Sequence, residues 1–568
     1  MQIGRRQVLR FGLAGTAACS ATAAGMGGRD ESDTRKEVRY LDAKRGRNPF
    51  TSNPPTERPH IFLLTADMIS PDHYLPSRTL HRRMNLPTLT SLAQDSVVFD
   101  NAFCASPLCA PARAALFTGR YTYITANGER AHDGHETTLR PDDTIFQEYL
   151  RASGYVTKHA GKGHVGTAKF IDAFDENSAG WDRWSPPIGS DEYYRAHLRA
   201  LGVRPQKYRR EIRGLQQDRK TPANSAGGWV VQDDGKPFPV EATYSCFLAD
   251  QAAIKLDAAL AQGAGPVYLQ MDLFDPHQPF SVPAGYERRE HELHSVCAEL
   301  PRSYRDTIEA GWKPQPGQPK IYDHYRRYWG LYDHTTLATY RTANALQMEV
   351  VDQAIGRFVA ELKKRELYDN SLIIFTADHG EMNGRRALVD KGVYLYPDVL
   401  RVPLMTKMPA GHGIKPRRVD APVSHLDIAP TVLSLAGIAP ECRLDGRSLL
   451  PLLNGVPGED RDFIFECGTH VGINFACGVQ SWSVNGRHDL YSYNASSNID
   501  ELYDLRDPDP VNLSGRPGHA AARKHMIERL GAVLARDPRW LAYWSSFQVD
   551  HYFDLPRSLP GDLQLRVF

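Results

Sequence analysis

The chain has 568 residues, of which 41% are hydrophobic and 24% charged, and its formal net charge at pH 7 is +1. This composition excludes a disordered or fibrous chain and is typical of a protein with a large buried core. The balanced charge gives no reason to expect a nucleic-acid partner. The chain is longer than a single core usually grows, so we expect one large domain and one smaller domain.

The N-terminus has the features of a twin-arginine export signal. Arg5 and Arg6 precede a mild apolar run from Phe11 to Ala24, which contains a small-residue cleavage site. The run is too short and too rich in alanine and glycine to span a membrane stably. We expect residues 1–24 to be a signal peptide and residues 25–58 a polar linker, so the mature protein is expected to be periplasmic or secreted. A disordered basic tail is the alternative.

Three apolar runs, at residues 60–65, 267–271 and 371–376, predict buried strands. Each run is continuous rather than alternating, as in parallel strands that are covered on both faces. Apolar residues at helical spacing from Met348 to Leu362 predict a helix before the third strand. This alternation predicts an α/β fold, in which helices sandwich a large mixed, mainly parallel sheet.

Polar residues follow these strands at Asp67, His277, Asp378 and His379. A lone aspartate after a strand is usually only a turn or a helix cap. Ligands of open parallel sheets, however, bind beyond the carboxyl ends of the strands. Several acidic and imidazole groups at these ends therefore predict a binding site.

The remaining segments differ in character. Residues 171–241 and 281–331 are rich in Arg, Tyr, Trp and Pro without clear periodicity, and we interpret them as insertions around the mouth of the site. Residues 464–493 resemble short antiparallel strands, and residues 520–535 resemble a helix. We therefore expect a catalytic domain at residues 59–450 and a smaller α+β domain at residues 451–568.

The segment from Cys109 to Arg120 predicts a helix with a cysteine at its start. Pro111 suits a first helical turn, and the alanines after it continue the helix. The N–H groups and dipole of a helix N-terminus favour anions. Arg113, one turn further on, is expected to neutralise an oxyanion there. A purely structural cysteine is the alternative for this segment alone.

The motif Cys109-x-Pro-x-Arg113, followed by Thr-Gly-Arg120, resembles the signature of the type I sulfatases, which belong to the alkaline-phosphatase-like superfamily. The resemblance implies that a formylglycine-generating enzyme oxidises Cys109 to Cα-formylglycine. Cys104 does not match this motif, because Ser106 stands where the motif has proline.

Further segments resemble the same family in the same order along the chain. The segment Gly-Lys162-x-His164-x-Gly implies a sulfate-binding lysine and a histidine that holds the formylglycine hydrate. Gly163 replaces a frequent tryptophan there, which we expect to change local packing rather than chemistry. His277 resembles the family's substrate-binding histidine, and Lys391 its second sulfate-binding lysine. Residues 501–505 resemble its C-terminal region.

The metal site implied by the resemblance lacks one common ligand. Asp67 aligns with the first of two paired aspartates, and Met68 stands in place of the second. A thioether is a poor ligand for a hard cation. The implied set is Asp67, Asp378, His379 and the oxygen of residue 109, as in the choline sulfatase and phosphonate monoester hydrolase branches. Calcium is the first choice of ion and manganese the second.

The resemblance implies a sulfuric ester hydrolase that cleaves a sulfate monoester, of a glycan or of a small aryl or alkyl alcohol. The implied catalytic residues are Cys109, Arg113, Lys162, His164, His277 and Lys391. A phosphonate or phosphate ester hydrolase on the same scaffold is the first alternative. An inactive sulfatase-like binding protein is the alternative from another class, and only Met68 favours it.

Overall fold

The computed structural model describes residues 58–121, 139, 143–165, 168–263, 265–313, 317–467, 476–482, 488–494 and 499–536. The predicted signal peptide lies outside the described residues, as does the predicted linker except for its last residue. Among the described residues, no helix has the length and apolar character needed to cross a membrane.

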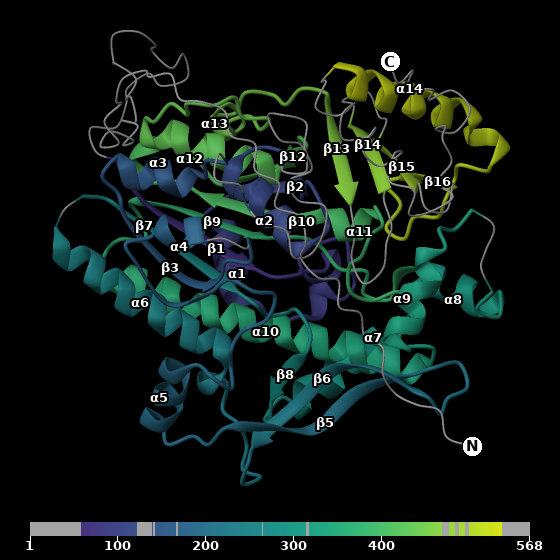
Figure 1. The fold of residues 1–568 in the computed structure, drawn as a ribbon, viewed down its shortest axis with the longest axis horizontal. Helices are drawn as coiled ribbons and strands as arrows, with labels where there is room; N and C mark the ends of the chain where they lie inside the picture. Colours follow the sequence, from purple (N-terminus) through teal and green to yellow (C-terminus); the bar gives the residue numbers. More distant parts are fainter. Residues whose placement is uncertain are drawn as a thin grey trace, which may run out of the picture. The chain divides into compact units, whose positions relative to one another are not determined.

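Among the described residues, the main sheet has nine strands, and most of them are labelled in Figure 1. They are β1 (His60–Ala66), β2 (Val97–Phe103), β3 (Val156–Lys162), β4 (Glu176–Trp181), β7 (Val267–Leu273), β9 (Ser371–Ala377), β10 (Arg401–Lys407), β11 (Arg417–Val419) and β12 (Val423–Ser424). Their order is β11-β2-β10-β9-β1-β7-β3-β4, with β12 paired to β2. Only β10 runs antiparallel to its neighbours, so the predicted mixed, mainly parallel sheet is confirmed.

The three strands predicted from continuous apolar runs are β1, β7 and β9, which are adjacent in the sheet. Every residue of these strands is buried, apart from half-buried His60 at the start of β1. Complete burial on both faces explains why their sequences do not alternate between apolar and polar residues.

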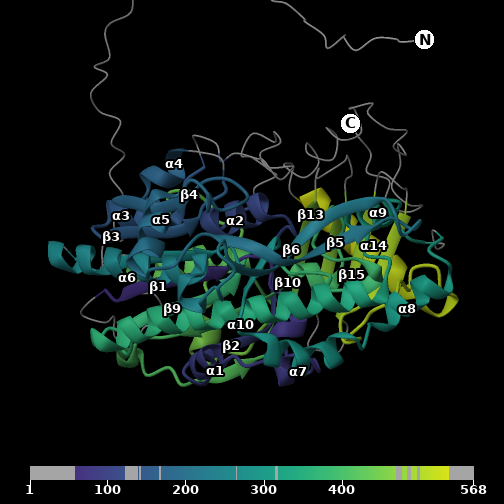
Figure 2. The ribbon, with the colours of Figure 1, turned by 90° about the horizontal axis from the view of Figure 1, so that it is seen from below.

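Helices pack on both faces of this sheet. The long helices α6 (Tyr244–Gln262) and α10 (His334–Lys364) lie side by side on one face (Figures 1 and 2). Phe62 of β1 and Phe358 of α10 meet edge to face, with 5.8 Å between ring centroids. On the other face, α2 (Cys109–Thr118), α3 (Phe146–Ala152) and α12 (Ile428–Ala436) contact one another. Shorter helices are α1 (Pro87–Gln94), α4 (Ala168–Asp172), α11 (Pro397–Leu400) and α13 (Leu450–Leu453).

The two segments interpreted as insertions contain regular elements. The first holds β4, α5 (Glu192–Ala200), β5 (Gln206–Leu215) and β6 (Pro222–Gln232), and the second holds β8 (Phe280–Pro283), α7 (Glu287–Cys297), α8 (Arg302–Glu309) and α9 (Ile321–Trp329). Strands β5, β6 and β8 form a separate three-stranded sheet. Most residues of β5 are exposed and polar. Its sequence therefore lacks the apolar alternation by which a strand is predicted.

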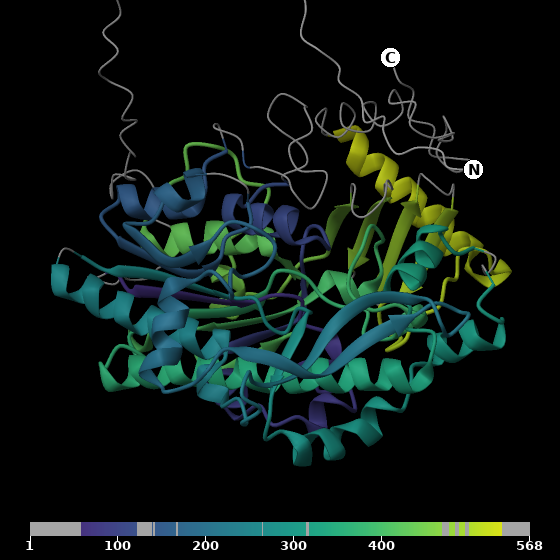
Figure 3. The same ribbon diagram turned by 60° about the horizontal axis from the view of Figure 1, so that its bottom comes forward.

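The C-terminal part contains an antiparallel sheet of β13 (Arg461–Cys467), β14 (Ala476–Trp482), β15 (His488–Asn494) and β16 (Ile499–Asp504). Helix α14 (Ala520–Arg536) packs against this sheet (Figure 3). The predicted strands and helix of this region are therefore confirmed. The sheet is joined to the large one by apolar contacts, such as Phe103 of β2 with Phe463 of β13 at 5.9 Å between ring centroids.

Candidate functional site

The parallel register of three strands brings the site together. Ala66, the last residue of β1, lies beside Leu273 of β7 and Ala377 of β9. The residues that follow these strands therefore emerge at one edge of the sheet, as predicted for ligand sites of such sheets. Asp67, Asp378 and His379 are the first of them.

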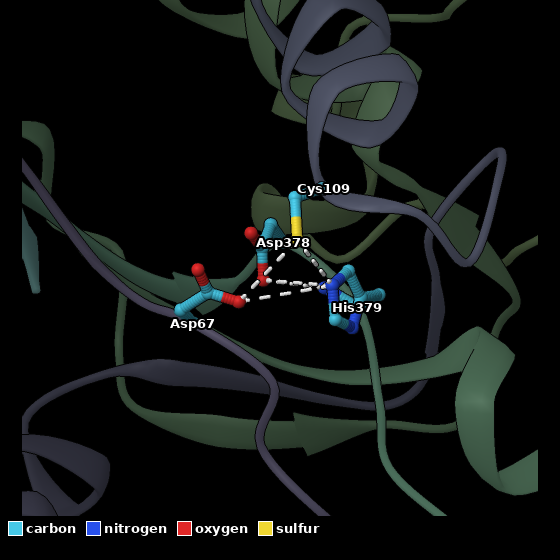
Figure 4. Close-up of side chains that lie close together, drawn as sticks. All are labelled: Asp67, Cys109, Asp378 and His379. Carbon is cyan, nitrogen blue, oxygen red and sulfur yellow. Dashed lines mark hydrogen bonds and ion pairs between the residues drawn. The ribbon is translucent and has the colours of Figure 1, made fainter. Parts of the chain in front are cut away.

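Four buried side chains form a compact cluster at this edge (Figure 4). Candidate ligand atoms of Asp67, Cys109, Asp378 and His379 all lie within 4.8 Å of one another. The Cys109 Sγ lies 3.2 Å from His379 Nε2 and 3.8 Å from Asp67 Oδ1. The structure thus brings together all four residues that were predicted to hold a metal ion.

Cys109 is the first residue of helix α2, as predicted from the proline after it. All ten residues of α2 are buried, and its alanines let the helix pack closely. The helix ends at Gly119, which has φ 65° and donates its N–H to Ala115 O at 2.9 Å. Arg113 lies four residues after Cys109, on the same side of the helix.

Arg113 is held by three carboxylates and a main-chain carbonyl. Its Nε lies 3.0 Å from Asp378 Oδ2, its Nη1 3.2 Å from Asp272 Oδ1, and its Nη2 3.9 Å from Asp67 Oδ2. Nη1 also donates to Lys162 O at 2.8 Å. Burial lowers the pKa of Arg113, but the three carboxylates outweigh it and keep the guanidinium charged.

Asp272 was not among the predicted site residues. It lies inside β7 and is fully buried. Besides Arg113, it binds Thr65 Oγ1, His159 Nε2 at 2.9 Å and Gln270 Nε2 at 2.7 Å. The only available signal was an acidic residue in an otherwise apolar run, which is costly unless it is paired.

Lys162 ends β3 and forms an ion pair with Asp67 through its Nζ. The backbone around it has special requirements. Gly161 has φ 118°, and a Cβ there would approach Asp272 O to 1.9 Å. A Cβ at Gly163 would lie 2.8 Å from the Phe170 ring, so Phe170 occupies the space into which a larger side chain would extend. His164 is 3% exposed and has a positive φ of 56°.

His277 and Lys391 form a second pair of basic side chains beside the cluster. Lys391 Nζ contacts His277 Nε2, and it also lies 3.3 Å from Asp390 Oδ1. Burial lowers the pKa of Lys391, whereas Asp390, Cys109 and Asp67 raise it, and the net pKa lies above the usual range. Lys391 therefore carries its positive charge within electrostatic range of Cys109.

The loop that carries Lys391 is fixed by buried polar contacts. Glu381 accepts the N–H of Asp390 at 2.7 Å and the hydroxyl of Tyr340 at 3.3 Å. Burial raises the pKa of Glu381 to about 8, despite the hydrogen bond from Asp390. Arg385, in the same loop, binds Asp72, which follows β1, at 2.8 Å. The sequence did not predict these supporting residues, because Tyr340 and Asp72 reach Glu381 and Arg385 only through the fold.

The electrostatics of the cluster suit a cation. Burial and Cys109 raise the pKa of Asp67, but Lys162, His277 and Arg113 outweigh them, so that its pKa lies below the usual range. Burial lowers the pKa of His379, while Asp378 and Cys109 raise it, to about 9 overall. The negative charge around His379 therefore favours a positive charge at this point in the cluster.

The donor set fits a divalent ion. Two carboxylates and an imidazole converge on one buried point, and His379 Nδ1 bonds to Gly380 O at 2.9 Å, which orients its Nε2 toward Cys109. Met68 contributes only its main-chain N–H, which donates to Asp378 Oδ1 at 3.0 Å. Asp67, Asp378 and His379 would hold the ion together with residue 109.

Comparison with known proteins agrees with this geometry. A family model described as "Sulfatase" matches residues 59–438, and one described as "N-sulphoglucosamine sulphohydrolase, C-terminal" matches residues 384–536. The uncharacterized sulfatase YidJ of Escherichia coli (strain K12) is 27% identical over 481 residues, which cover 81% of this chain and 85% of that protein. A choline-sulfatase of Rhizobium meliloti (strain 1021) is 28% identical over 416 residues, with 71% and 72% covered.

Among solved structures, a phosphonate monoester hydrolase from Silicibacter pomeroyi superposes with a TM-score of 0.64 at 21% identity, covering 84% of this chain and 95% of that one. At this identity the superposition shows a shared fold. The sulfatase model, in contrast, spans more than half of the chain and includes every residue of the cluster around Cys109. The protein therefore belongs to the sulfatase family of enzymes.

Proposed function

We propose that the protein hydrolyses a sulfate monoester at the site around Cys109, by way of a formylglycine. The observation that carries this proposal is the convergence of Arg113, Lys162 and Lys391 with a metal-type donor set around one buried cysteine. A sulfate ester is an anion, and it can be attacked only after its charge is neutralised. These groups would provide that neutralisation.

In this proposal the Cys109 side chain stands where the formylglycine would be. The hydrated aldehyde supplies two hydroxyls on one carbon, one to attack sulfur and one whose deprotonation expels sulfate. Arg113 and Lys162 bind the sulfate oxygens and hold the ester in place. His277 or Lys391 donates a proton to the leaving alcohol, and His164 accepts the proton that allows sulfate to leave.

The proposed metal ion is divalent, with calcium as the first choice and manganese as the second. Asp67, Asp378, His379 and residue 109 would hold it. Bound there, it would add positive charge beside the sulfate group. His379 makes the donor set softer than an all-oxygen calcium site, which is why manganese is retained.

Phosphonate or phosphate ester hydrolysis is the second candidate function. Two observations favour it: Met68 stands in the place of a second aspartate, and a histidine follows Asp378. One of the solved structures with this fold is a phosphonate monoester hydrolase. Rates on matched 4-nitrophenyl sulfate, phosphate and phenylphosphonate esters decide between the two. Strong phosphonate turnover with negligible sulfatase activity would replace the first proposal with the second.

Two measurements test the nucleophile. Mass spectrometry of the peptide that contains residue 109 should show a loss of about 18 Da, because an aldehyde replaces the thiol. A Cys109→Ala variant should lose hydrolysis of every ester, whereas Cys104→Ala, outside the motif, should retain it. Full activity in Cys109→Ala would refute a role of this residue in catalysis. Hydrolysis by the wild-type protein would in turn contradict the alternative of an inactive binding protein.

We also propose that the chain is exported through its twin-arginine segment, with the formylglycine-generating enzyme acting before export. The support is the order of Arg5-Arg6, a mild apolar run and a small-residue cleavage site. Fractionation of bacterial cells should place the wild-type protein in the periplasm. The double variant Arg5→Lys and Arg6→Lys should remain in the cytoplasm, and an unchanged distribution would contradict the proposal.

A further inference from the structure

Trp184 is a large aromatic residue left exposed beside the candidate site. It is 42% exposed, whereas Trp181, Trp229 and Trp329 are at most 8% exposed. Aromatic side chains that line binding sites present a ring face to the ligand in place of a core contact. The position of Trp184 relative to the site residues therefore decides whether its exposure has a function.

The Trp184 ring lies next to the aromatic pair that includes His277. Its centroid is 6.4 Å from that of His277 and 6.4 Å from that of Phe274. His277 and Phe274 stack on each other, with 4.9 Å between centroids. His277 in turn contacts Lys391 through Nε2, and Lys162 Nζ lies 5.4 Å from the Phe274 ring. The indole is thus one residue away from both proposed sulfate-binding lysines.

The backbone that carries Trp184 is tied to the segment that carries Lys162. Trp181 O accepts the N–H of Gly163 at 2.8 Å, and Asp182 Oδ1 accepts the N–H of Val165 at 2.7 Å. On its other side, Pro187 O accepts the N–H groups of Ser190 and Asp191, each at 2.8 Å. These bonds fix the backbone before and after Trp184, so little ordering of this segment is required on binding.

The charges near Trp184 leave an uncharged ring as the ligand that the indole favours. Lys162 and Lys391 form ion pairs with Asp67 and Asp390, so the charges of the two lysines are balanced locally. Arg183, the residue before Trp184 in the chain, is exposed. An uncharged ring can stack on the exposed indole without a counter-ion, whereas a quaternary ammonium would add a positive charge in the neighbourhood of Arg183.

We propose that Trp184 forms the subsite for the leaving alcohol, and that this alcohol carries a flat, uncharged ring face. An aryl ring and the C–H face of a sugar share this chemistry. The inference rests on the proposed ester hydrolysis and adds to it the class of substrate. When the sulfate group lies between Lys162 and Lys391, the ring of the alcohol extends past His277 onto the indole.

The test compares kcat/KM of wild type, Trp184→Ala and Trp184→Phe on four esters: 4-nitrophenyl sulfate, N-acetylglucosamine 6-sulfate, choline sulfate and ethyl sulfate. Comparing each variant with wild type on the same ester cancels the intrinsic reactivity of that ester. Trp184→Ala should lose about tenfold on at least one ring ester and less than twofold on ethyl sulfate. Trp184→Phe should recover most of the loss, because it restores a ring face.

The pattern of losses separates the two sources of the ring. A loss on 4-nitrophenyl sulfate alone indicates an aryl substrate, and a loss on the sugar ester alone indicates a glycan. Inhibition by inorganic sulfate should be unchanged in Trp184→Ala, since sulfate has no ring. The matched control is Tyr193→Ala, which removes another exposed aromatic side chain (57% exposed) on α5 and should leave all four rates unchanged.

Three results would overturn the inference: equal losses on ethyl sulfate and the ring esters, no loss on any ester, or the largest loss on choline sulfate. Absence of turnover by the wild-type protein on all four esters would instead refute the proposed sulfatase activity, and the subsite would be refuted with it. If Trp184→Ala unfolds at the same temperature as wild type, any loss of activity does not come from a loss of folded protein.

Discussion

Asp272 and Arg113 form an ion pair with 3.2 Å between Oδ1 and Nη1, and both side chains are at most 2% exposed. The second oxygen of Asp272 is bound by His159 and Gln270. Burial raises the pKa of Asp272, but the hydrogen bond from His159 and the charge of Arg113 outweigh it, so the carboxylate stays ionised. Asp272 thus holds the Arg113 guanidinium from β7. The site has no second aspartate after Asp67, because Met68 stands there.

We therefore predict that Asp272→Asn impairs both stability and substrate binding. Removing one partner of a buried ion pair costs about 3 kcal/mol, because the other charge stays buried. With Arg113 less firmly oriented, KM for a sulfate ester should rise about tenfold per folded molecule. Urea unfolding and initial rates measure the two effects separately.

Asp250→Asn is the matched control for this variant. Asp250 pairs with Arg357 at 2.8 Å, and the two side chains are 32% and 38% exposed. A pair this exposed contributes about 1 kcal/mol or less, and it lies away from Cys109, so KM should not change. If Asp272→Asn behaves like Asp250→Asn, Asp272 does not position Arg113.

The sequence predicted the parts of the site that depend on which residue directly follows a strand or begins a helix. Asp67, Asp378 and His379 follow continuous apolar strands, and Cys109 precedes a helix-forming segment, so each could be placed at an element end. Parallel pairing then implies that these ends meet. The structure confirms that proximity, with ligand atoms within 4.8 Å.

The sequence did not predict features that depend on packing between distant segments. Asp272 matters because its strand register places it beside Thr65 and Gly161. The first half of α10 was missed because Arg341 and Asn344 are buried there with polar partners, which interrupts the apolar spacing. The sequence did not indicate a role for Trp184, because only the fold brings its ring next to His277.

A second prediction concerns the metal ion. Chelation should abolish turnover and lower the unfolding temperature of wild type, because an ion that binds only the folded state stabilises it, by about 2.7 kcal/mol at a concentration 100 times its Kd. Calcium should restore both properties most fully, and manganese next. Differential scanning fluorimetry provides a readout that does not depend on activity.

Asp67→Asn tests where the ion binds. The substitution removes one of the two carboxylates in the cluster. The unfolding temperature of this variant should no longer respond to chelator or to added calcium. A shift with calcium as large as that of wild type would place the ion elsewhere.

A third prediction concerns the proton donor to the leaving alcohol. If His277 or Lys391 has this role, then one of His277→Ala and Lys391→Ala should slow a poor leaving group much more than a good one. We expect an extra loss of about 100-fold on an alkyl sulfate relative to 4-nitrophenyl sulfate, since nitrophenolate leaves without a proton. Single-substrate kinetics on both esters give the ratio.

Lys162→Ala is the control for leaving-group dependence. Lys162 forms an ion pair with Asp67 and is proposed to bind sulfate oxygens rather than to donate a proton. Its loss should slow both esters by a similar factor. Equal factors for His277→Ala and Lys391→Ala as well would show that neither residue protonates the alcohol.

The fourth prediction uses a buried acid that lies away from the site. Glu501 in β16 accepts hydrogen bonds from the hydroxyls of Tyr322 and Tyr503. Burial raises its pKa from 4.5 to about 7, although Tyr503, Arg386 and Tyr322 lower it. Its raised pKa means that protonated Glu501 stabilises the fold fully below pH 4.5, and that this contribution is lost as the pH rises through about 7.

Glu501→Gln should remove this dependence, because glutamine resembles the protonated acid at every pH. Relative to wild type, the variant should gain about 2 kcal/mol in free energy of unfolding between pH 5 and pH 8. Urea unfolding at the two pH values measures the gain. Glu459→Gln, at a glutamate whose side chain is 85% exposed, should show no such change. A difference between Glu501→Gln and wild type that stays constant or shrinks with rising pH would mean that Glu501 is ionised in the folded protein throughout this range.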